Sequence, residues 1–347
     1  MKEIRVGIVG YGWVASAHIK SFDEIPGVRV TAVCSRRKLD PDQLLIKHGS
    51  KIDVYNDFAE MCAQKDIDVI SICTPHPFHP EQTEIAAKAG KHLVIEKPVA
   101  IDLEGLNRVE KAVKSAKVKA MICFEVKVIG HFKVMRDMLD KGLIGDVHYA
   151  ECDYYHGIGP WYGQYEWNKK KDFGGSSLLT AGCHSLDGLI WLMGSRPAEV
   201  TSYAAQSSAP AFKAYEYPTT TTTIMKFENG AVGKTASVID CIQPYLFNVH
   251  LCGSRGSIWN DKFHTDTISG LDKKGWSTLH TQLVDSGDVA HHPYRELFED
   301  FIGAIREKRE PRFSFADGIF SHRVCLAADK SAATGKPVRV ASLEARS

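Results

Sequence analysis

The sequence predicts an α/β protein with two domains: a doubly wound parallel sheet, followed by an α/β domain with a large, mainly antiparallel sheet. The 347 residues are enough for two domains of about 100–200 residues each. Up to residue 123, short apolar runs alternate with helical patterns, and after Val147 runs rich in Thr, Val, Tyr and Phe follow. We therefore expect one domain over residues 1–123 and another over 124–347.

Residues 4–123 are expected to alternate between strands and helices. The short apolar runs predict buried strands, and the longer amphipathic stretches between them predict helices. The expected strands are 4–9, 28–34, 69–73 and 92–95, and the expected helices are 14–22, 39–47, 57–63, 79–89 and 103–116. Short strands joined by helices require right-handed crossovers, which predicts a parallel sheet covered on both faces.

Five runs after residue 147 have the composition of strands. They are 147–155, 200–206, 219–227, 231–239 and 247–252. Asn229-Gly230, between the third and fourth runs, is a hairpin signal, and strands joined by hairpins predict a mainly antiparallel sheet. Two helices are expected near the C-terminal end, at 294–307 and 316–333.

The composition excludes several classes of protein. A hydrophobic content of 44% and a charged content of 24% are typical of a globular chain rather than a disordered one. The formal net charge of +1 provides no field that would attract nucleic acid or an anionic membrane, so neither partner is expected. The nine cysteines form no C-x-x-C pair, and the N-terminal segment suits neither a signal peptide nor a membrane span. We therefore expect a cytoplasmic protein in which local sites supply any binding.

A glycine-rich turn follows the first expected strand. Gly10-Tyr-Gly12-Trp-Val-Ala15 fits the pattern G-x-G-x-x-A and directly precedes an expected helix. In this context Gly10 permits a tight turn, Gly12 lets the backbone approach a pyrophosphate, and Ala15 allows close packing of helix on strand. The alternative is a glycine-rich turn without a ligand. The order of strand, fingerprint and helix favours a dinucleotide-binding Rossmann domain.

The end of the second expected strand bears on the choice of cofactor. Enzymes that bind NAD commonly have an acidic residue there for the ribose 2′-hydroxyl, but this chain has Ser35, Arg36 and Arg37. An arginine can pair with a 2′-phosphate, so NADP is slightly preferred over NAD. Alternatively, the two arginines form a solvated pair or stack on the adenine.

A lysine ends the last expected strand of the first domain. Lys97 lies in Glu96-Lys97-Pro98, at the edge of the sheet where doubly wound folds bind their ligands. A lysine taken alone is as often a structural or solvent-exposed residue, but the following proline fixes the turn and favours a role in the site.

A helical segment after Gly174-Gly175 carries a second group of reactive side chains. Helical spacing places Thr180, His184, Asp187 and Trp191 in one row beside an apolar stripe. Near a nicotinamide site, His184 is a candidate general base. The alternative is a core histidine that is hydrogen-bonded to Asp187.

These motifs together resemble the Gfo/Idh/MocA oxidoreductases, which include glucose-fructose oxidoreductase and inositol dehydrogenase. The resemblance covers nearly the whole chain and rests on Gly10-x-Gly12-x-x-Ala15, Thr74-Pro75 with His79, Glu96-Lys97-Pro98, Gly174-Gly175, Gly182-x-His184-x-x-Asp187 and Pro293-Tyr294 to Phe301. It implies an N-terminal Rossmann domain and a C-terminal α/β domain with a large open-faced antiparallel sheet, often used for oligomerisation. It also implies oxidation or reduction of sugars, cyclitols or related alcohols, with Lys97 and His184 at the catalytic positions, and a homo-oligomer such as a dimer or tetramer.

The expected site residues fall into three sets. Lys97 and His184 are the expected catalytic residues. The expected cofactor contacts are Gly10, Gly12, Trp13, Val14, Ser35, Arg36, Arg37, Thr74, Pro75, His76, His79, Glu96 and Lys97. The expected substrate contacts are Lys97, Lys127, His156, Trp161, Tyr162, Thr180 and His184.

Aromatic rings in the loop after residue 155 suit the C–H faces of a sugar or polyol, although a packing loop or an oligomer contact is the alternative. No metal is expected, because His76, His79, His291 and His292 have no carboxylate cluster near them in sequence.

The sequence departs from the family pattern at two positions. Many members carry an aspartate four residues before the histidine, where this chain has Thr180. A hydroxyl can donate a hydrogen bond but adds no charge that would raise the basicity of the imidazole. The second departure is His76 in Thr74-Pro75-His76, where asparagine is frequent, and it affects contacts near the cofactor ribose.

Three functions follow from these observations. The first is an NAD(P)-dependent oxidoreductase that transfers a hydride between a carbohydrate, cyclitol or related polyol and the nicotinamide. The second is an enzyme that uses bound cofactor only transiently, so that oxidation enables elimination or hydrolysis of a glycoside before the ketone is reduced again; Thr180 keeps this alternative open. The third is a dinucleotide-binding sensor without turnover, which the presence of both Lys97 and His184 argues against.

Overall fold

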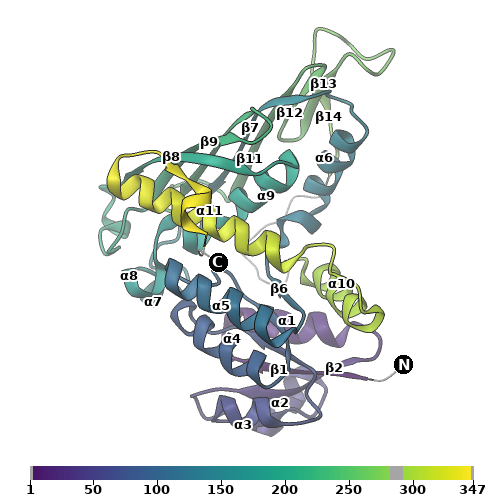
Figure 1. Cartoon of the computed structure of the whole chain (residues 1–347), viewed down its shortest axis with the longest axis vertical. Coiled ribbons are helices and arrows are strands. Elements are labelled where there is room, and N and C mark those ends of the chain that lie inside the picture. The colour runs from purple at the N-terminus through teal and green to yellow at the C-terminus, as the bar shows by residue number, and fades with distance from the viewer. Residues whose placement is uncertain (1–2, 282–291, 345–347) are drawn as a thin grey trace. The chain divides into compact units, whose positions relative to one another are not determined.

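The computed structural model describes residues 3–281 and 292–344, and its contacts divide the chain into two compact units (Figure 1). The first unit is Met1–Cys123 with Asp288–Ile319, and the second is Phe124–Gly287 with Phe320–Ser347. This grouping differs in one place from the two continuous domains that we expect from the sequence, because helix α10 (Tyr294–Glu307) belongs to the first unit. The division into domains 1–123 and 124–347 stays a prediction.

The first unit is built on a parallel sheet of six strands in the order β3-β2-β1-β4-β5-β6. The strands are β1 (Ile4–Val9), β2 (Val28–Cys34), β3 (Asp53–Tyr55), β4 (Val69–Ile72), β5 (His92–Ile95) and β6 (Ala120–Ile122). Strands β2 and β3 lie on one side of β1, and β4, β5 and β6 follow on its other side, so the order of the strands reverses between β1 and β4. Ligands of such sheets bind at this reversal, outside the carboxyl ends of the strands. The predicted doubly wound parallel sheet is confirmed.

Six α-helices lie within the described part of the first unit. They are α1 (Trp13–Asp23), α2 (Pro41–His48), α3 (Phe58–Ala63), α4 (His79–Lys88), α5 (Leu103–Ala116) and α10, with the 3₁₀ turn η1 (His76–Phe78) before α4. α10 packs on α1, where the rings of Phe22 and Phe298 stack with their centroids 4.2 Å apart. Both phenylalanines are fully buried, and burial of a side chain of this size contributes about 1.5–3 kcal/mol. This contact explains why a helix so late in the chain returns to the first unit.

The second unit contains a mixed sheet of nine strands in the order β14-β13-β12-β11-β7-β10-β9-β8-β15. Its strands are β7 (Val147–Tyr155), β8 (Pro197–Ala205), β9 (Thr220–Phe227), β10 (Val232–Val238), β11 (Leu246–Gly253), β12 (Gly256–Trp259), β13 (Lys262–Thr265), β14 (Ser277–Thr278) and β15 (Val338–Arg339). Among the described strand pairs of this second sheet, only β7 and β10 run in parallel, so the sheet is mainly antiparallel, as predicted.

Helices and turns cover one side of this sheet (Figure 1). They are the 3₁₀ turn η2 (Glu125–Val128), α6 (Gly130–Asp140), α7 (Tyr165–Asn168), α8 (Lys171–Gly174), the π-helical turn η3 (Leu178–Gly182), α9 (Cys183–Met193), the 3₁₀ turns η4 (Pro210–Phe212) and η6 (Val340–Leu343), and α11 (Phe315–Thr334), which starts in the first unit. Side chains that face them alternate along each strand, as Met225 and Phe227 do on β9. Among the described helices, none has the length and apolar character needed to cross a membrane.

Candidate functional site

The glycine fingerprint forms the turn between β1 and α1. Gly10 has a φ of +90°, and a Cβ there would lie 2.8 Å from the backbone of Cys73, so glycine is needed for this turn. At Gly12 a Cβ would meet no atom of the described residues within 4 Å, so packing against them does not require glycine there. Gly12 is also the N-cap of α1 and caps it with no side chain. An open approach to an uncapped helix N-terminus fits the pyrophosphate of a dinucleotide.

The loop after β2 carries the residues predicted to choose between NAD and NADP. Ser35 is buried and its Oγ accepts a hydrogen bond from the backbone N–H of Arg37 at 3.1 Å, while both arginines are exposed. The Arg37 guanidinium donates to the carbonyl of Tyr11 in the fingerprint turn, and the Arg36 guanidinium lies 5.2 Å from the ring centroid of Phe78. Two cations therefore border the turn.

His79 links two turns at the carboxyl edge of the sheet. Its Nε2 lies 2.7 Å from the carbonyl oxygen of Thr74 and its Nδ1 lies 2.8 Å from that of Pro98. Burial lowers the pKa of His79, although the two carbonyls oppose this shift. The imidazole is fully buried, so it ties the Thr74-Pro75 loop to the Glu96-Lys97-Pro98 turn.

The remaining predicted cofactor contacts surround the same edge. Val14, Thr74, Pro75 and Lys97 are half-buried, His76 and Glu96 are buried, and the Trp13 side chain is 40% exposed. The Trp13 ring stands edge-on to that of His292, with the centroids 6.0 Å apart. Of the two adjacent histidines considered above as metal ligands, His291 lies outside the described residues. Each of these cofactor contacts stays a prediction.

A buried histidine on α1 holds the turn that carries Lys97. His18 Nδ1 lies 2.8 Å from Ser71 Oγ, and its Nε2 lies 3.0 Å from Glu96 Oε1. Glu96 Oε2 accepts a hydrogen bond from the backbone N–H of Lys97 at 3.2 Å. Burial lowers the pKa of His18, but Cys73 and Glu96 outweigh it and raise the pKa to about 10.

His18, Glu96 and Cys123 also bring three potential metal-ligating atoms within 4.8 Å of one another. Both ring nitrogens of His18 already lie at hydrogen-bonding distance from protein atoms, so the geometry is that of a hydrogen-bond network.

In the second unit, His184 lies at the start of α9 among buried charged groups. His184, Glu125, Lys127 and Asp187 are all at most 6% exposed. Lys127 Nζ lies 2.9 Å from Asp187 Oδ2, and Asp187 Oδ1 accepts a hydrogen bond from Ser321 Oγ at 2.7 Å. Asp187 is thus held by Lys127 and Ser321.

Glu125 is the carboxylate that approaches the imidazole of His184. Its Oε1 lies 3.7 Å from His184 Nε2, and the ring of Phe124 stands edge-on to the imidazole at 6.2 Å between centroids. The sequence motifs did not single out Glu125. It is 59 positions from His184 in the chain, and no helical or strand spacing relates residues so far apart.

Thr180 lies in a π-helical turn that precedes the α-helix of His184. Residues 178–182 form a π-helical turn before α9, and the wider turn breaks the spacing expected from a regular helix. Thr180 Oγ1 donates to Asn168 Oδ1 at 2.5 Å, so its hydroxyl is committed to α7. The expectation of a regular α-helix through Thr180 and His184 is wrong for this reason, and the placement of the two side chains in one row stays a prediction.

The aromatic loop after β7 packs partly on itself. His156 Nδ1 lies 3.0 Å from the Tyr154 hydroxyl oxygen, and the His156 ring contacts the rings of Tyr162 and Tyr245 edge-on, at 5.5 and 5.2 Å between centroids. Burial raises the pKa of Tyr154 well above its usual value, and the nearby Glu125 acts in the same direction. Trp161 is 67% exposed. The loop therefore offers the exposed ring of Trp161 beside a packed aromatic cluster.

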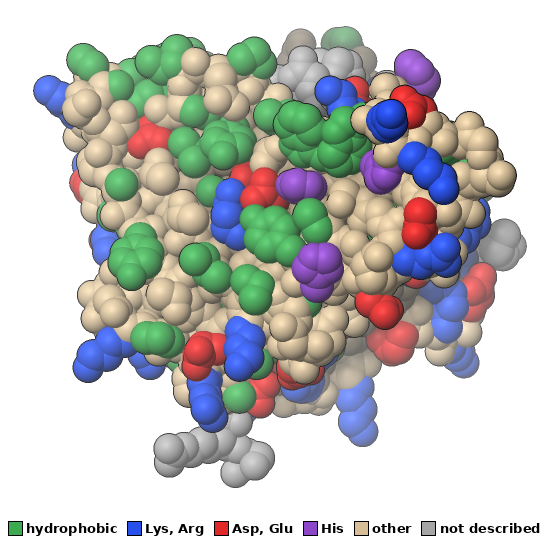
Figure 2. Space-filling view, turned by 90° about the horizontal axis from the view of Figure 1, so that it is seen from above, with side chains coloured by type: hydrophobic (Ala, Val, Ile, Leu, Met, Phe, Trp, Pro, Cys, Tyr) green, Lys and Arg blue, Asp and Glu red, His purple; other side chains and the backbone are tan. Residues whose placement is uncertain are grey.

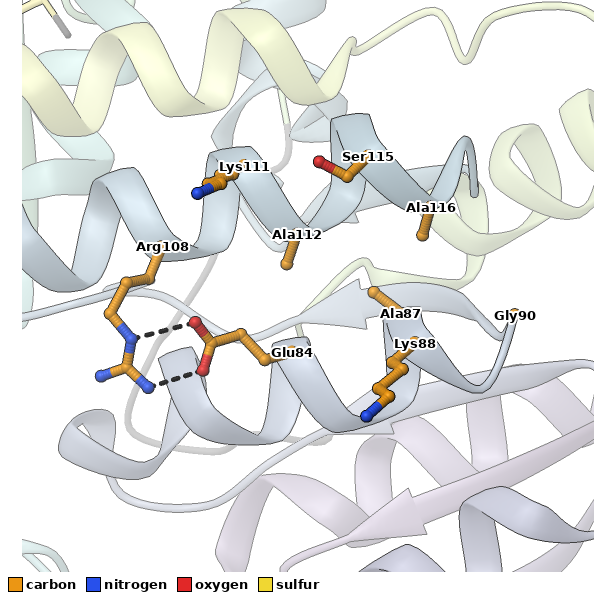
Figure 3. A pocket seen from close by; sticks show the side chains of 9 residues that line it. All are labelled: Glu84, Ala87, Lys88, Gly90, Arg108, Lys111, Ala112, Ser115 and Ala116. Carbon is orange, nitrogen blue, oxygen red and sulfur yellow. Dashed lines mark hydrogen bonds and ion pairs between the residues drawn. The ribbon is translucent and has the colours of Figure 1, made fainter.

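A separate hollow lies between α4 and α5 (Figure 3). It is lined by Glu84, Ala87, Lys88, Gly90, Arg108, Lys111, Ala112, Ser115 and Ala116. At one end of it the Arg108 guanidinium donates two hydrogen bonds to the Glu84 carboxylate, at 3.0 and 2.6 Å, and so joins the two helices. None of the predicted site residues lines this hollow.

Comparisons with known proteins agree with this architecture. A family model described as "Oxidoreductase family, NAD-binding Rossmann fold" matches residues 4–124, and its companion, "Oxidoreductase family, C-terminal alpha/beta domain", matches residues 136–340. The chain belongs to the Gfo/Idh/MocA oxidoreductase family. The resemblance predicted from the motifs is confirmed, as is the assignment to an NAD-binding oxidoreductase fold.

Relatives within the Gfo/Idh/MocA family include proteins of differing names. "Inositol 2-dehydrogenase" of Rhizobium meliloti (strain 1021) is 25% identical over 97% of this chain and 99% of its own. "Glycosyl hydrolase family 109 protein 1" of Bacteroides thetaiotaomicron is 23% identical over 84% of this chain and 65% of its own. The solved structure of levoglucosan dehydrogenase in complex with NADH and levoglucosan has a TM-score of 0.86 at 22% identity, over 98% of this chain and all of that one, and shows the shared fold.

Proposed function

We propose that this chain is an NAD(P)-dependent dehydrogenase or reductase that acts on a CH–OH group of a sugar, cyclitol or related polyol. The observation that carries the proposal is the buried His184 with a carboxylate oxygen 3.7 Å from its Nε2, in a chain whose first domain belongs to an NAD-binding family. A buried histidine beside a carboxylate is suited to accept a proton. The names of the relatives support a polyol substrate.

The proposed reaction divides the work between two residues. The ammonium of Lys97 hydrogen-bonds the reacting oxygen, and its charge stabilises the negative charge that develops there. His184 takes the hydroxyl proton as general base. A bound nicotinamide supplies the hydride acceptor. Lys127, His156, Trp161, Tyr162 and Thr180 are proposed to contact or border the substrate.

We also propose a preference for NADP over NAD. The first domain belongs to an NAD-binding family, and the finer choice rests on Arg36 and Arg37 at the end of β2, where no carboxylate is present. A 2′-phosphate would accept charge-assisted hydrogen bonds from these guanidinium groups.

A second candidate function is a reaction without net oxidation, in which a transient ketone permits elimination or hydrolysis of a glycoside. Thr180, hydrogen-bonded to Asn168 in place of an aspartate, favours keeping this candidate, as does a relative named as a glycosyl hydrolase.

One experiment separates the two candidates. Purified protein is incubated with a panel of sugars, cyclitols and glycosides and with NAD or NADP, and both the absorbance of the reduced nicotinamide and the sugar products are followed. Reduced cofactor formed in proportion to product supports the dehydrogenase. Product formed without net reduced cofactor supports the second candidate, and tight cofactor binding without any product would contradict both.

A further inference from the structure

The cluster around His184 contains a carboxylate on an element that the sequence motifs leave out. Glu125 opens the 3₁₀ turn η2, and its Oε1 approaches His184 Nε2 to 3.7 Å. The side chains are 8% and 5% exposed, so water screens the interaction of their charges poorly. At this separation the two groups form an ion pair when the imidazole is protonated.

The position that carries an aspartate in many family members cannot supply this charge. Thr180 has no charge, and its hydroxyl is bonded to Asn168 Oδ1, which lies 3.4 Å from the Tyr217 hydroxyl as well. The π-helical turn over 178–182 breaks the α-helical register between Thr180 and His184.

The second carboxylate of the cluster has other partners. Asp187 is neutralised by Lys127 at 2.9 Å and also accepts from Ser321 Oγ. Other described titratable or charged groups lie on α9 itself or on elements that pack against it or bond to it. They are Cys183, Lys127, His131, Lys133, Arg136, Asp137, Asp140, His148, Tyr149, Glu151, Cys152, Asp153, Tyr154, Tyr155, Lys234, Asp317, His322, Arg323, Cys325, Asp329 and Lys330. Glu151 accepts a hydrogen bond from the Tyr149 hydroxyl at 2.7 Å, and Asp329 accepts one from Ser176 Oγ at 2.8 Å. Asp153 is paired with Lys234 at 2.9 Å, and Arg136 with Asp140 at 2.6 Å. Glu125 is thus the carboxylate placed to act on His184.

We propose that Glu125 is the positioning residue of His184 and supplies, from η2, the carboxylate that the family pattern places four residues before the histidine. Glu125 stabilises the imidazolium form, so His184 becomes a stronger base for the hydroxyl proton. Glu125 therefore provides, from another segment of the chain, the negative charge that the aspartate provides in those family members. The site keeps a carboxylate although position 180 is a threonine. This inference deepens the proposed function and rests on it for one point, which is that the proton accepted by His184 comes from a substrate hydroxyl.

The direct test is the titration of His184 in solution. The ¹⁵N-labelled imidazole is followed by NMR against pH in the wild-type protein and in Glu125→Gln, and the His184 signal is assigned by its loss in His184→Asn. We expect the midpoint of His184 to fall by about one pH unit in Glu125→Gln, since an opposite charge within about 4–6 Å has been removed. Glu125→Asp, which keeps a carboxylate, should recover part of the shift, and Glu199→Gln on β8 should leave the midpoint unchanged.

Equal midpoints in the wild type and Glu125→Gln would overturn the proposal. If Glu125→Gln does not fold, Glu125→Asp decides the question, because its shorter side chain lies farther from the imidazole. An unchanged midpoint in Glu125→Asp would then overturn the proposal.

The kinetic test uses the active enzyme with its cofactor. Glu125→Gln should lower kcat/KM by about 10-fold and shift the rising limb of its pH profile to lower pH. In the His184→Asn background the same substitution should cause no further loss, because Glu125 acts through the imidazole. Losses that multiply in the double variant would show that Glu125 acts on its own and would overturn the inference. Failure of the wild-type protein to convert any sugar or polyol would instead contradict the proposed function, and the NMR comparison would still decide on Glu125.

Discussion

Lys97 lies two residues after the end of β5 in the parallel sheet, and its backbone N–H donates a hydrogen bond to Glu96 Oε2 at 3.2 Å. The side chain is half-buried at the edge where ligands of such sheets bind. The positive charge matters for the proposed chemistry, because a cation stabilises a developing alkoxide more strongly than a neutral hydrogen-bond donor does.

Lys97→Met should therefore lower kcat by about 10²-fold or more while the affinity for the cofactor changes little. Steady-state kinetics and fluorescence titration with the reduced cofactor measure the two effects separately. Lys88→Met, at an exposed lysine on α4, serves as the matched control and should leave both unchanged. Turnover near the wild-type value in Lys97→Met would remove Lys97 from the catalytic residues.

For Thr180 we predict an effect on stability and none on the pH dependence of the rate. Thr180→Val removes one hydrogen bond to Asn168 Oδ1, which keeps the Tyr217 hydroxyl as a donor at 3.4 Å, so the free energy of unfolding should fall by about 0.5–1.5 kcal/mol. The pH at which kcat/KM rises should stay at the wild-type value, because the charge partner of His184 is Glu125. Urea denaturation and a pH profile test both parts, with Thr180→Ser as the variant that keeps the hydroxyl. A shifted profile in Thr180→Val would assign the role of Glu125 to Thr180.

At the scale of elements, α1 is fastened to β4 and β5 by a buried charged histidine. The pKa of His18 is raised to about 10, because Cys73 and Glu96 outweigh the effect of burial. A group whose pKa is higher in the folded than in the unfolded state stabilises the fold fully below the unfolded value, near 6.5, and loses that contribution as the pH rises toward the folded value.

We expect the free energy of unfolding to fall between about pH 6.5 and 10 in the wild type. His18→Gln should be less stable at pH 6.5, and its stability should depend less on pH over this range. Urea midpoints at several pH values measure this, with His148→Gln at an exposed position of β7 as control. The same slope in His18→Gln and the wild type would show that another group titrates.

The loop after β2 carries the prediction on cofactor choice. Replacing Arg36 and Arg37 by Ala should weaken NADP binding far more than NAD binding, since a 2′-phosphate would lose charge-assisted hydrogen bonds of about 1.5–3 kcal/mol each. Dissociation constants for both cofactors give the result, and Arg29→Ala, on the same strand but away from its carboxyl end, is the matched control. Equal losses for the two cofactors would mean that the arginines do not read the phosphate.

The elements that could be predicted from sequence are those with a strong local pattern. Strands β1, β2 and β5 were expected at their observed bounds, because short apolar runs between helical patterns leave few alternatives. The short strands β12 to β14 were not expected, since runs of two to four residues carry too little periodicity. The amphipathic pattern of α10 indicated a helix, but no pattern shows which domain a helix packs on.

The candidate site was predictable only in part, for the same reason. His184 and Lys97 stand in short motifs, whereas Glu125 lies in a turn that resembles no motif and becomes meaningful only through a contact between distant segments. The π-helical turn before α9 has the composition of an ordinary helix, Leu178-Leu-Thr-Ala-Gly182, so this irregularity could not be expected. Sequence spacing assumes a regular helix, and this site depends on an irregular one.

At the scale of the whole molecule, the sheet of the second unit bears on assembly. Side chains alternate along its strands, so the face away from α9 presents apolar groups to solvent, among them Tyr203 at 72%, Ile224 at 51%, Val232 at 44% and Trp259 at 42% exposed. Figure 2 shows hydrophobic side chains gathered in several groups on this side, with charged and histidine side chains between them. Exposed apolar patches of this kind commonly mark protein interfaces.

We therefore predict that the protein is a homo-oligomer that buries this face. Tyr203 and Ile224 lie on adjacent antiparallel strands, where Tyr203 pairs with Thr222 and Thr201 pairs with Ile224, so the two side chains are diagonal neighbours on one face. Replacing both by Glu places charges that would be desolvated without partners in an interface, and this should lower the mass measured by light scattering to that of a smaller species. The control replaces Leu45 and Ile46 on α2, 46% and 76% exposed, by Glu, and should keep the wild-type mass. A wild-type protein that runs as a monomer at all concentrations would contradict the assembly. An unchanged mass in the Tyr203/Ile224 variant would instead place the interface elsewhere, because two buried carboxylates without partners cost more than a typical interface can tolerate.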